Sequence, residues 1–214
     1  MIEQDADFTL MESRVPLYLL FIEIVILLLS FIFSFDKQVW VLEVFPILTG
    51  LPILILTYNR FKLTNFLYTL LVIHSIILAV GGIYTYAKVP LGFWMQDWFG
   101  FARNHYDRIG HFAQGFFPAI LVRELLIRTS PLTQGKWLKF VIISICLAIS
   151  AFYELIEFTY AKLANETADS FLGSQGDIWD AQWDMTFALI GAIVSLIILS
   201  KLHDKSLQEK LVSY

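Results

Sequence analysis

The amino-acid sequence predicts an all-α protein, a polytopic bundle of transmembrane helices, and three observations support this. Of the 214 residues, 57% are hydrophobic and only 16% are charged, which is far more apolar than a typical soluble domain. The apolar residues form long uninterrupted runs instead of the stripes that leave one face of a soluble helix polar. Six runs reach the roughly 20 helical residues that a hydrocarbon core of about 30 Å requires.

These runs follow one another along almost the whole chain, which predicts a single integral membrane domain over residues 1–214. Several acidic residues precede the first run and no small-residue cleavage site follows it, so we expect it to be retained and not to act as a signal peptide. Cys146 falls inside the fifth run, where its simplest interpretation is a small core residue. The expected spans are approximately 15–35, 39–57, 63–86, 107–128, 137–160 and 181–202.

The distribution of positive charge predicts which side of the membrane each end of the chain faces. Lys and Arg residues are twice as frequent on the side shared by both termini as on the other side, and short cytoplasmic loops are enriched in these residues. We therefore expect both termini in the cytoplasm and the protein in an inner membrane. Tryptophans, which are typical of membrane interfaces, gather at the expected outer boundary: Trp40, Trp94, Trp98, Trp179 and Trp183.

The segment between the third and fourth spans, about residues 87–106, is expected to lie in the outer headgroup layer. Phe93, Trp94, Trp98 and Phe101 recur there at helical spacing, which is typical of helices that lie in the plane of a membrane interface. Two interpretations stay open. The segment is either a simple aromatic anchor or a lid over a site that faces the lipid.

The fourth span begins with ionisable side chains, which are informative because a charge at the centre of a bilayer costs about 2.5–3.5 kcal/mol. Asp107 and His111 are four residues apart and Gln114 follows three residues later, so all three share one helical face. Arg108 lies next to Asp107 in the sequence. The alternatives are an ordinary interfacial ion pair between Asp107 and Arg108, and a histidine that is hydrogen-bonded in the core.

The fifth and sixth spans add carboxylates. Glu154 and Glu157 lie one turn apart near the outer end of the fifth span, where two like charges repel each other unless a cation or a proton lies between them. Asp177, Asp180 and Asp184 form one stripe at the start of the sixth span if its helix begins near Asp177. Asp177 is equally suited to be the N-cap of that helix.

The directions of the spans predict that these groups meet. Spans four and six run inward and span five runs outward, so their acidic ends lie at one height, together with Glu43 at the start of span two. We expect these residues to line a common cavity that is open to the outer side. Glu23 and His74 are isolated in their spans and are interpreted as structural hydrogen-bonding partners.

Clustered carboxylates and an imidazole are able to bind a divalent metal ion, and a carboxylate-rich set favours Mg, Mn, Ca or Fe. The sequence contains no HExxH, P-loop or GxSxG motif that would indicate a known type of catalytic site. The candidate metal ligands are Glu154, Glu157, Asp177, Asp180 and Asp184. The candidate catalytic residues are Asp107 and His111, and the other polar residues of the site are Arg108, Gln114 and Glu43.

Three separated motifs resemble those of one protein family. DRIGHFAQGFFPAILVRE at 107–124, YELIE at 153–157 and GSQGDIWDAQWDM at 173–185 are together similar to the YjdF family of bacterial inner-membrane proteins. The resemblance covers most of the chain. It implies location and topology more than a chemical reaction.

A weaker likeness is to VanZ-like membrane proteins, which are associated with resistance to glycopeptide antibiotics. This sequence departs from their pattern at Glu157, where an amide is usual, and at residues 185–188, which lack the usual asparagine. The resemblance implies a shared helical core. The corresponding positions are Asp107, Arg108, His111, Glu154, Asp184 and Gly191.

Two functions of different classes are the main alternatives, and a purely structural assembly partner, which explains the paired acids least well, is a third. The first is an enzyme that acts on a lipid or a lipid-linked envelope molecule, with metal-binding carboxylates and with His111 or Asp107 as acid or base. The alternative is a non-enzymatic transporter, or a lipid- or cation-binding protein, in which the same carboxylates bind a proton, a cation or a basic ligand. Six helices make a small carrier unless it forms a homo-oligomer. Membrane lipids are the expected partners, and nucleic acid is not expected.

Overall fold

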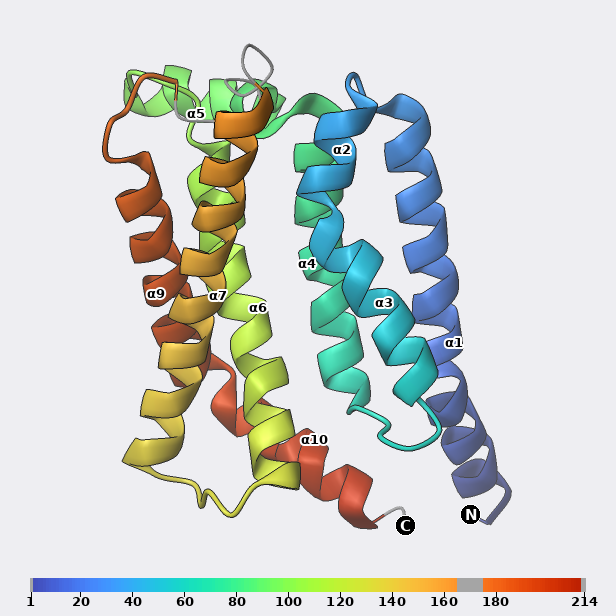
Figure 1. The fold of residues 1–214 in the computed structure, drawn as a ribbon. Helices are drawn as coiled ribbons and strands as arrows, with labels where there is room; N and C mark the ends of the chain where they lie inside the picture. The colour runs from blue at the N-terminus through green and yellow to red at the C-terminus, as the bar shows by residue number, and fades with distance from the viewer. Residues whose placement is uncertain (1, 165–174, 213–214) are drawn as a thin grey trace.

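The computed structural model describes residues 2–164 and 175–212, with the backbone alone for residues 2–13, 164 and 211–212. All regular elements within these ranges are helices, so the all-α prediction is confirmed. Figure 1 shows two groups of long helices side by side, with the earlier part of the chain in one group and the later part in the other. The first group contains α1 (Ile2–Phe33), α2 (Lys37–Glu43), α3 (Phe45–Thr57) and α4 (Asn65–Tyr84).

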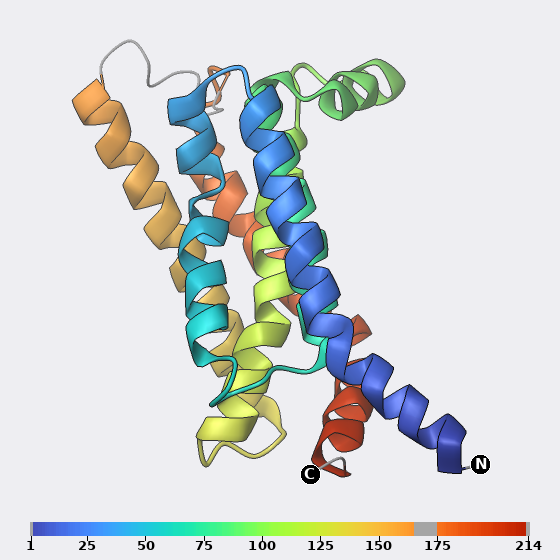
Figure 2. The ribbon, with the colours of Figure 1, turned by 90° about the vertical axis from the view of Figure 1, so that its right-hand side faces the viewer.

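The expected second span is two short helices, α2 and α3, which meet at an angle of 55°. Helix α2 begins after Asp36, whose Oδ1 accepts hydrogen bonds from the backbone N–H groups of Gln38 and Val39 at 2.8 and 3.1 Å. This is a regular N-cap. The break falls at Val44, just before Pro46, which has no N–H to donate to a continuous helix. Figure 2 shows the bend, and Glu43 is the last residue of α2 before it.

Two glycines bring helices of the second group into backbone contact. A Cβ atom at Gly115 of α6 would lie 1.8 Å from the carbonyl oxygen of Ala188 in α9, and one at Gly191 of α9 would lie 2.1 Å from that of Phe112 in α6. Small residues at helix crossings allow this approach in membrane proteins. The second group consists of α6 (Tyr106–Thr129), α7 (Lys136–Ala164) and α9 (Asp180–Ile198).

Short helices lie across both ends of the bundle (Figure 1). The 3-10 helix η1 (Tyr86–Lys88) and α5 (Pro90–Phe99) lie at one end, which we name the α5 end, and α10 (Ser200–Val212) lies at the other, the α10 end. Helix α5 belongs to the segment that we expect in the headgroup layer. It exposes more than half of the side-chain surface of Trp94 and Trp98, and it ends at Gly100, whose φ of 67° suits glycine.

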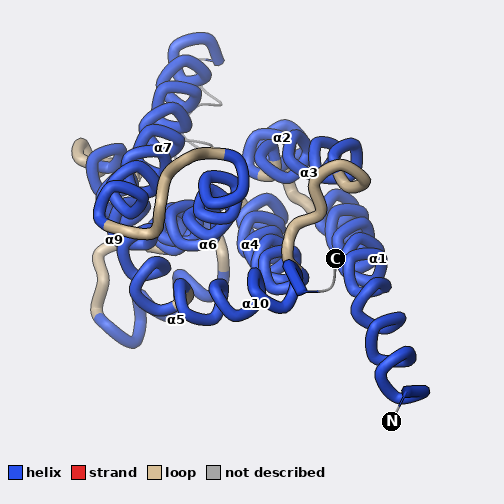
Figure 3. Tube along the Cα trace, turned by 90° about the horizontal axis from the view of Figure 1, so that it is seen from below, coloured by secondary structure: helices blue, strands red, loops and turns tan. Residues whose placement is uncertain are grey.

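Within residues 2–164 and 175–212, four helices are long and apolar enough to cross a membrane, and the bent pair α2 and α3 makes a fifth candidate. Helix α6 is the remaining expected span. Its 24 residues are long enough to span a membrane. Its composition is too polar to make it a candidate like the others, because it contains five charged residues: Asp107, Arg108, Arg123, Glu124 and Arg128. The structure gives the physical reason, because α6 contacts α4, α7 and α9 and is shielded by them (Figure 3). The count of six spans and the cytoplasmic location of the termini stay predictions.

The isolated polar residues of the other spans are buried between helices. Glu23 of α1 is 4% exposed and faces the Ser75 side chain of α4. His74 of α4 stacks on the Phe117 ring of α6, with 5.5 Å between the ring centroids. Cys146 is 1% exposed within an apolar cluster of α6, α7 and α9, as a small core residue would be.

Candidate metal centre

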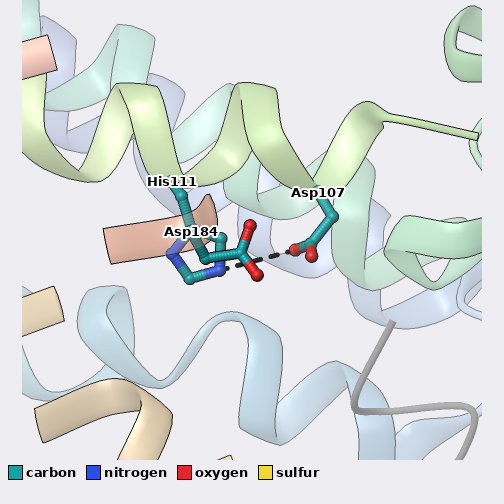
Figure 4. A group of neighbouring side chains, drawn as sticks. All are labelled: Asp107, His111 and Asp184. Atoms are coloured by element: carbon teal, nitrogen blue, oxygen red, sulfur yellow. Dashed lines mark ion pairs between the residues drawn. The ribbon is translucent and has the colours of Figure 1, made fainter. Parts of the chain in front are cut away.

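His111 occupies the centre of the candidate site, on the second turn of α6. Its Nε2 atom lies 3.5 Å from Oδ1 of Asp107, which precedes it by one turn (Figure 4). Its Nδ1 atom lies 3.0 Å from Oε1 of Gln114, which follows it by about one turn. The three side chains therefore share one helical face, and both ring nitrogens of His111 have a defined direction.

Asp184 reaches this face from α9. Because Gly115 and Gly191 let the two helices touch, the first turns of α6 and α9 lie close together at the α5 end. Asp184 is 1% exposed. Asp107, His111 and Asp184 each offer one ligand atom, and the three atoms lie within 4.8 Å of one another. Figure 4 shows the three side chains converging between α6 and α9.

Helix α7 supplies two further carboxylates to the same imidazole. Oε1 of Glu154 lies 3.7 Å from Nε2 of His111, and Glu157, one turn further along α7, is 9% exposed. His111, Glu154 and Glu157 form a second group whose ligand atoms all lie within 4.8 Å of one another. His111 is the member common to both groups, so three helices direct one imidazole and four carboxylates toward a single region.

Two carboxylate oxygens of this region lack the hydrogen bonds that burial normally requires. Oδ1 of Asp184 and Oε1 of Glu154 are buried and have no hydrogen-bond partner among the described residues. A buried carboxylate oxygen without a donor is unfavourable, and several carboxylates close together repel one another. The arrangement therefore calls for a cation or for protons among these groups.

Helix α2 and Tyr153 of α7 close the site on its other side. Glu43 is 5% exposed and interacts electrostatically with Asp107. The Tyr153 hydroxyl donates a hydrogen bond of 2.7 Å to the carbonyl oxygen of Leu42, and its ring meets the His111 ring edge-on with 6.5 Å between centroids. Sequence reasoning missed Tyr153, although its position four residues before Glu157 places both on one face of α7.

Asp177 and Asp180 belong to a neighbouring ion-pair group. Arg108 Nη2 lies 3.0 Å from Asp177 Oδ2, and Arg103 contacts both Asp180 and Asp177. The expected pair between Asp107 and Arg108 is replaced by this one, and the Arg108 guanidinium also lies over the Trp183 ring at 5.2 Å. Asp177 and Asp180 are already neutralised by guanidinium groups. They are therefore poorer metal ligands than the carboxylates around His111, which have no guanidinium partner of this kind in the described part of the chain. Sequence reasoning did not assign Arg103 to the site.

Asp177 also differs from the expected N-cap. Helix α9 begins at Asp180 and its N-cap residue is Trp179, whose backbone N–H donates to Oδ1 of Asp177 at 3.0 Å. Asp177 therefore stabilises the turn before the helix, and the stripe on α9 itself consists of Asp180 and Asp184. Residues 173 and 174 of the GSQGDIWDAQWDM motif lie outside the described residues.

The arginines affect a histidine in the loop before α6. Burial, followed by the positive charges of Arg108 and Arg103, lowers the pKa of His105 below its ordinary value of 6.5. The charges of Asp180 and Asp177 oppose this effect. The His105 ring also meets the Phe101 ring edge-on, with centroids 5.0 Å apart. Burial and the two guanidinium groups therefore favour the neutral imidazole of His105.

Comparisons with known proteins agree with the membrane architecture. A family model described as "Predicted membrane protein (DUF2238)" matches residues 15–205. The chain is 47% identical to the inner membrane protein YjdF of Escherichia coli (strain K12) over 183 residues, which cover 86% of this chain and 88% of that protein. No solved structure matches the chain significantly.

Proposed function

The chain belongs to the DUF2238 family of predicted membrane proteins and is an inner-membrane protein, and we propose that it binds one divalent metal ion at the α5 end. The proposed ligands are His111, Asp184, Glu154 and Glu157. In this proposal the bound metal ion serves an enzyme that acts on a lipid or a lipid-linked envelope molecule, and Asp107 is the acid or base.

One observation carries the proposal. The imidazole of His111 is shared by two groups of ligand atoms, each within 4.8 Å, that come from three different helices. An acidic cluster alone would be weak support, but Asp184 Oδ1 and Glu154 Oε1 are also buried without a hydrogen-bond donor. A metal ion among these atoms would satisfy both oxygens and remove the repulsion between them.

Gln114 supports a ligand role for His111. In the tautomer in which Nδ1 donates to Gln114 Oε1, Nε2 presents a lone pair to the surrounding carboxylates. Metal-bound histidines usually have their second nitrogen held in this way by an acceptor. Carboxylate oxygens with one imidazole nitrogen suit Mn or Fe better than Ca, which prefers oxygen ligands alone. Asp177 and Asp180 are left out of the proposed ligand set because guanidinium groups already neutralise them.

Asp107 is the best placed acid or base in this arrangement. It lies in the first turn of α6, one turn closer to the α5 end than His111, and its carboxylate is 3.5 Å from the His111 ring. A bound metal ion would polarise an ester or phosphoester and lower the pKa of a bound water. Asp107 would then accept the proton of that water.

Metal analysis of the purified full-length protein tests the binding step. We expect about one Mn or Fe per chain in the wild type and a loss of most of it in Asp184→Asn and Glu157→Gln. Asp177→Asn is the matched control, since it removes a nearby charge from outside the proposed ligand set. A wild type that stays free of metal after titration with Mn²⁺ and Fe²⁺, or an Asp184→Asn variant with full metal content, would refute the proposal.

Lipid turnover tests the catalytic step separately. Metal-loaded protein is incubated with a total inner-membrane lipid extract, and products are followed by mass spectrometry. We expect one lipid class to be consumed by the wild type and not by Asp107→Asn, which should keep its metal. Equal turnover by the wild type and Asp107→Asn would refute the role of Asp107 as acid or base. Absence of turnover by both proteins would refute the enzymatic function.

A second candidate function is a non-enzymatic carrier in which the same carboxylates bind protons or a cation. The observation that favours it is the burial of Glu23 and His74 in α1 and α4, because transporters place ionisable residues along a path through the membrane. Proton- or cation-dependent uptake into proteoliposomes, abolished by Glu154→Gln and Glu23→Gln, would support the carrier. Uptake that both variants leave unchanged would count against it.

A further inference from the structure

The α10 end contains a buried polar network that is separate from the candidate metal centre. Glu124 of α6 and His203 of α10 are both fully buried, and Oε2 of Glu124 lies 3.0 Å from Nε2 of His203. The other imidazole nitrogen, Nδ1, lies 2.7 Å from Nη1 of Arg123. Thr64, the N-cap of α4, donates to Glu124 through its N–H and its hydroxyl at 3.0 and 2.8 Å. The network therefore joins α4, α6 and α10.

A cavity of about 170 Å³ opens next to this network, between α6, α7, α9 and α10. Leu138, Ile142 and Leu196 form its apolar side, and these residues belong to the hydrophobic cluster of α6, α7 and α9. The polar residues that line it are Arg123, Gln134, Lys139, Ser200 and Asp204, and Gly135 completes the lining. The cavity thus has one polar and one apolar side.

The polar side of the cavity carries a net positive charge. Arg123 Nη2 lies 2.6 Å from Oδ1 of Asp204, which also accepts a hydrogen bond of 3.1 Å from Gln134, so these two charges cancel. Lys139 adds a further positive charge on an exposed side chain. Arg123 uses two of the five guanidinium N–H groups for His203 and Asp204. Lys139 therefore leaves the lining with one net positive charge, which favours an anion.

The first turn of α7 also favours the binding of an anion in the cavity. Gly135 lines the cavity and α7 begins at Lys136, so the free N–H groups of the first turn lie next to it and favour an anion. Trp137 in the same turn is 74% exposed, as expected of a tryptophan at the headgroup level of a membrane. The cavity therefore lies where the headgroups and the hydrocarbon of a bilayer meet.

We propose that this cavity binds a phosphate group, and that its source is an anionic phospholipid of the cytoplasmic leaflet. The volume is below the 300–1,000 Å³ of typical small-molecule sites, so it suits a small anionic group such as one phosphate. The acyl chains would lie outside the cavity, because Leu138, Ile142 and Leu196 are at most 5% exposed within the helix cluster. Basic pockets between transmembrane helices on the cytoplasmic side recognise anionic headgroups in this way.

The test measures binding to the purified full-length protein in mixed detergent micelles. Phosphatidylglycerol is the anionic probe, phosphatidylcholine the zwitterionic probe, and inorganic phosphate the probe without acyl chains. Affinity is read from ligand-dependent shifts in the thermal unfolding temperature and from native mass spectrometry. We expect phosphatidylglycerol to raise the unfolding temperature and to remain bound in the gas phase, and phosphatidylcholine to do neither.

Variants of Lys139 and Lys136, which are both exposed, identify the site without disturbing the buried network. Lys139→Gln should weaken phosphatidylglycerol binding about five-fold, whereas Lys136→Gln, one turn away and outside the lining, should not change it. Asp204→Asn should strengthen binding, because it removes the one negative charge of the lining. Arg123 is left intact because its substitution could prevent folding.

The outcomes separate the sources of the phosphate. If inorganic phosphate binds as tightly as phosphatidylglycerol, and Lys139→Gln weakens both, the phosphate site stands and the lipid as its source is refuted. Equal binding of phosphatidylglycerol and phosphatidylcholine would overturn the proposal. Equal effects of Lys139→Gln and Lys136→Gln would overturn it as well, since they would indicate a diffuse surface attraction.

Discussion

Oε1 of Gln114 lies 3.0 Å from Nδ1 of His111, about one helical turn further along α6. The amide fixes the direction of the ring, so that Nε2 faces the carboxylates of Asp107 and Glu154. A histidine that rotated freely in the same place could turn away from these groups. A contact within α6 therefore orients the ring of His111 in a site to which three helices, α6, α7 and α9, contribute side chains.

Replacement of Gln114 by leucine should weaken metal binding while leaving every proposed ligand in place. Loss of an outer-shell partner of a metal-bound histidine typically costs 10- to 100-fold in affinity, so we expect a decrease of about that size. Isothermal titration with Mn²⁺ measures it. Gln182→Leu, an exposed glutamine of α9, is the control. Equal affinities of Gln114→Leu and the wild type would show that the amide does not position the ring.

Replacement of Gly115 by alanine should separate α6 from α9. The new Cβ would lie 1.8 Å from the backbone carbonyl oxygen of Ala188, which cannot move aside as a flexible side chain could. We expect a loss of at least about 1–3 kcal/mol of stability, together with weaker metal binding. Thermal unfolding in detergent measures the first effect. Gly50→Ala is the matched control, because no atom lies within 4 Å of its new Cβ; a similar loss in both variants would contradict the prediction.

Replacement of Glu124 by alanine should strongly destabilise the α10 end. It leaves the buried His203 and the Arg128 guanidinium without their carboxylate, and breaking a buried pair in this way costs about 3–5 kcal/mol. Thermal unfolding again provides the measurement. Glu209→Ala, which removes the partner of Lys205 in an exposed ion pair, should have almost no effect. A Glu124→Ala protein as stable as Glu209→Ala would mean that the network contributes little.

His105 should stay neutral at a pH at which an ordinary histidine is protonated. Burial and the charges of Arg108 and Arg103 lower its pKa below 6.5, so the folded protein binds this proton less readily than the unfolded chain. The resulting stabilisation is present above pH 6.5 and is lost as the pH falls through the lowered pKa. NMR titration of the imidazole, assigned with His105→Gln, measures the pKa. Asp177→Asn should lower it further, and a midpoint at or above 6.5 would contradict the prediction.

Cysteine labelling in intact cells tests the orientation. In a Cys146→Ser background, a cysteine in place of Trp98 on α5 should react with a membrane-impermeant maleimide, because the α5 end is expected to face outward. A cysteine in place of Lys205 on α10 should react only after the membrane is disrupted. The reverse pattern would mean that the topology derived from the positive charges is inverted.

Sequence periodicity predicted the groups of the candidate site that lie on one helix. The spacing of Asp107, His111 and Gln114, and that of Glu154 and Glu157, follow from the helical repeat alone. The directions of the spans predicted that these ends meet at one height, and the structure brings Asp184 to the same place. The common face could therefore be inferred before any coordinates, whereas the start of α9 at Asp180 could not.

Contacts set by loop paths and by residues distant in the chain were not predictable in this way. Arg103 pairs with Asp180 across 77 residues, from a loop whose course has no periodic signal. Glu124 and His203 are 79 residues apart, and the composition of their spans indicated only positive charge at that end. Pro46 is a local indication of the break between α2 and α3 at Val44, because proline cannot continue the backbone hydrogen bonds of a helix. The second span was predicted from its apolar residues alone, so this indication was not used.

The central, shielded position of α6 has a consequence for biosynthesis. A helix with five charged residues is too polar to partition stably into lipid alone while it leaves the translocon. If α6 crosses the membrane as expected, the nascent helix would stay beside the insertion machinery, or beside α4, until α7 and α9 emerge and cover it. A ribosome that stalls between α6 and α9 would therefore release a chain whose fourth long hydrophobic segment fails to enter the membrane.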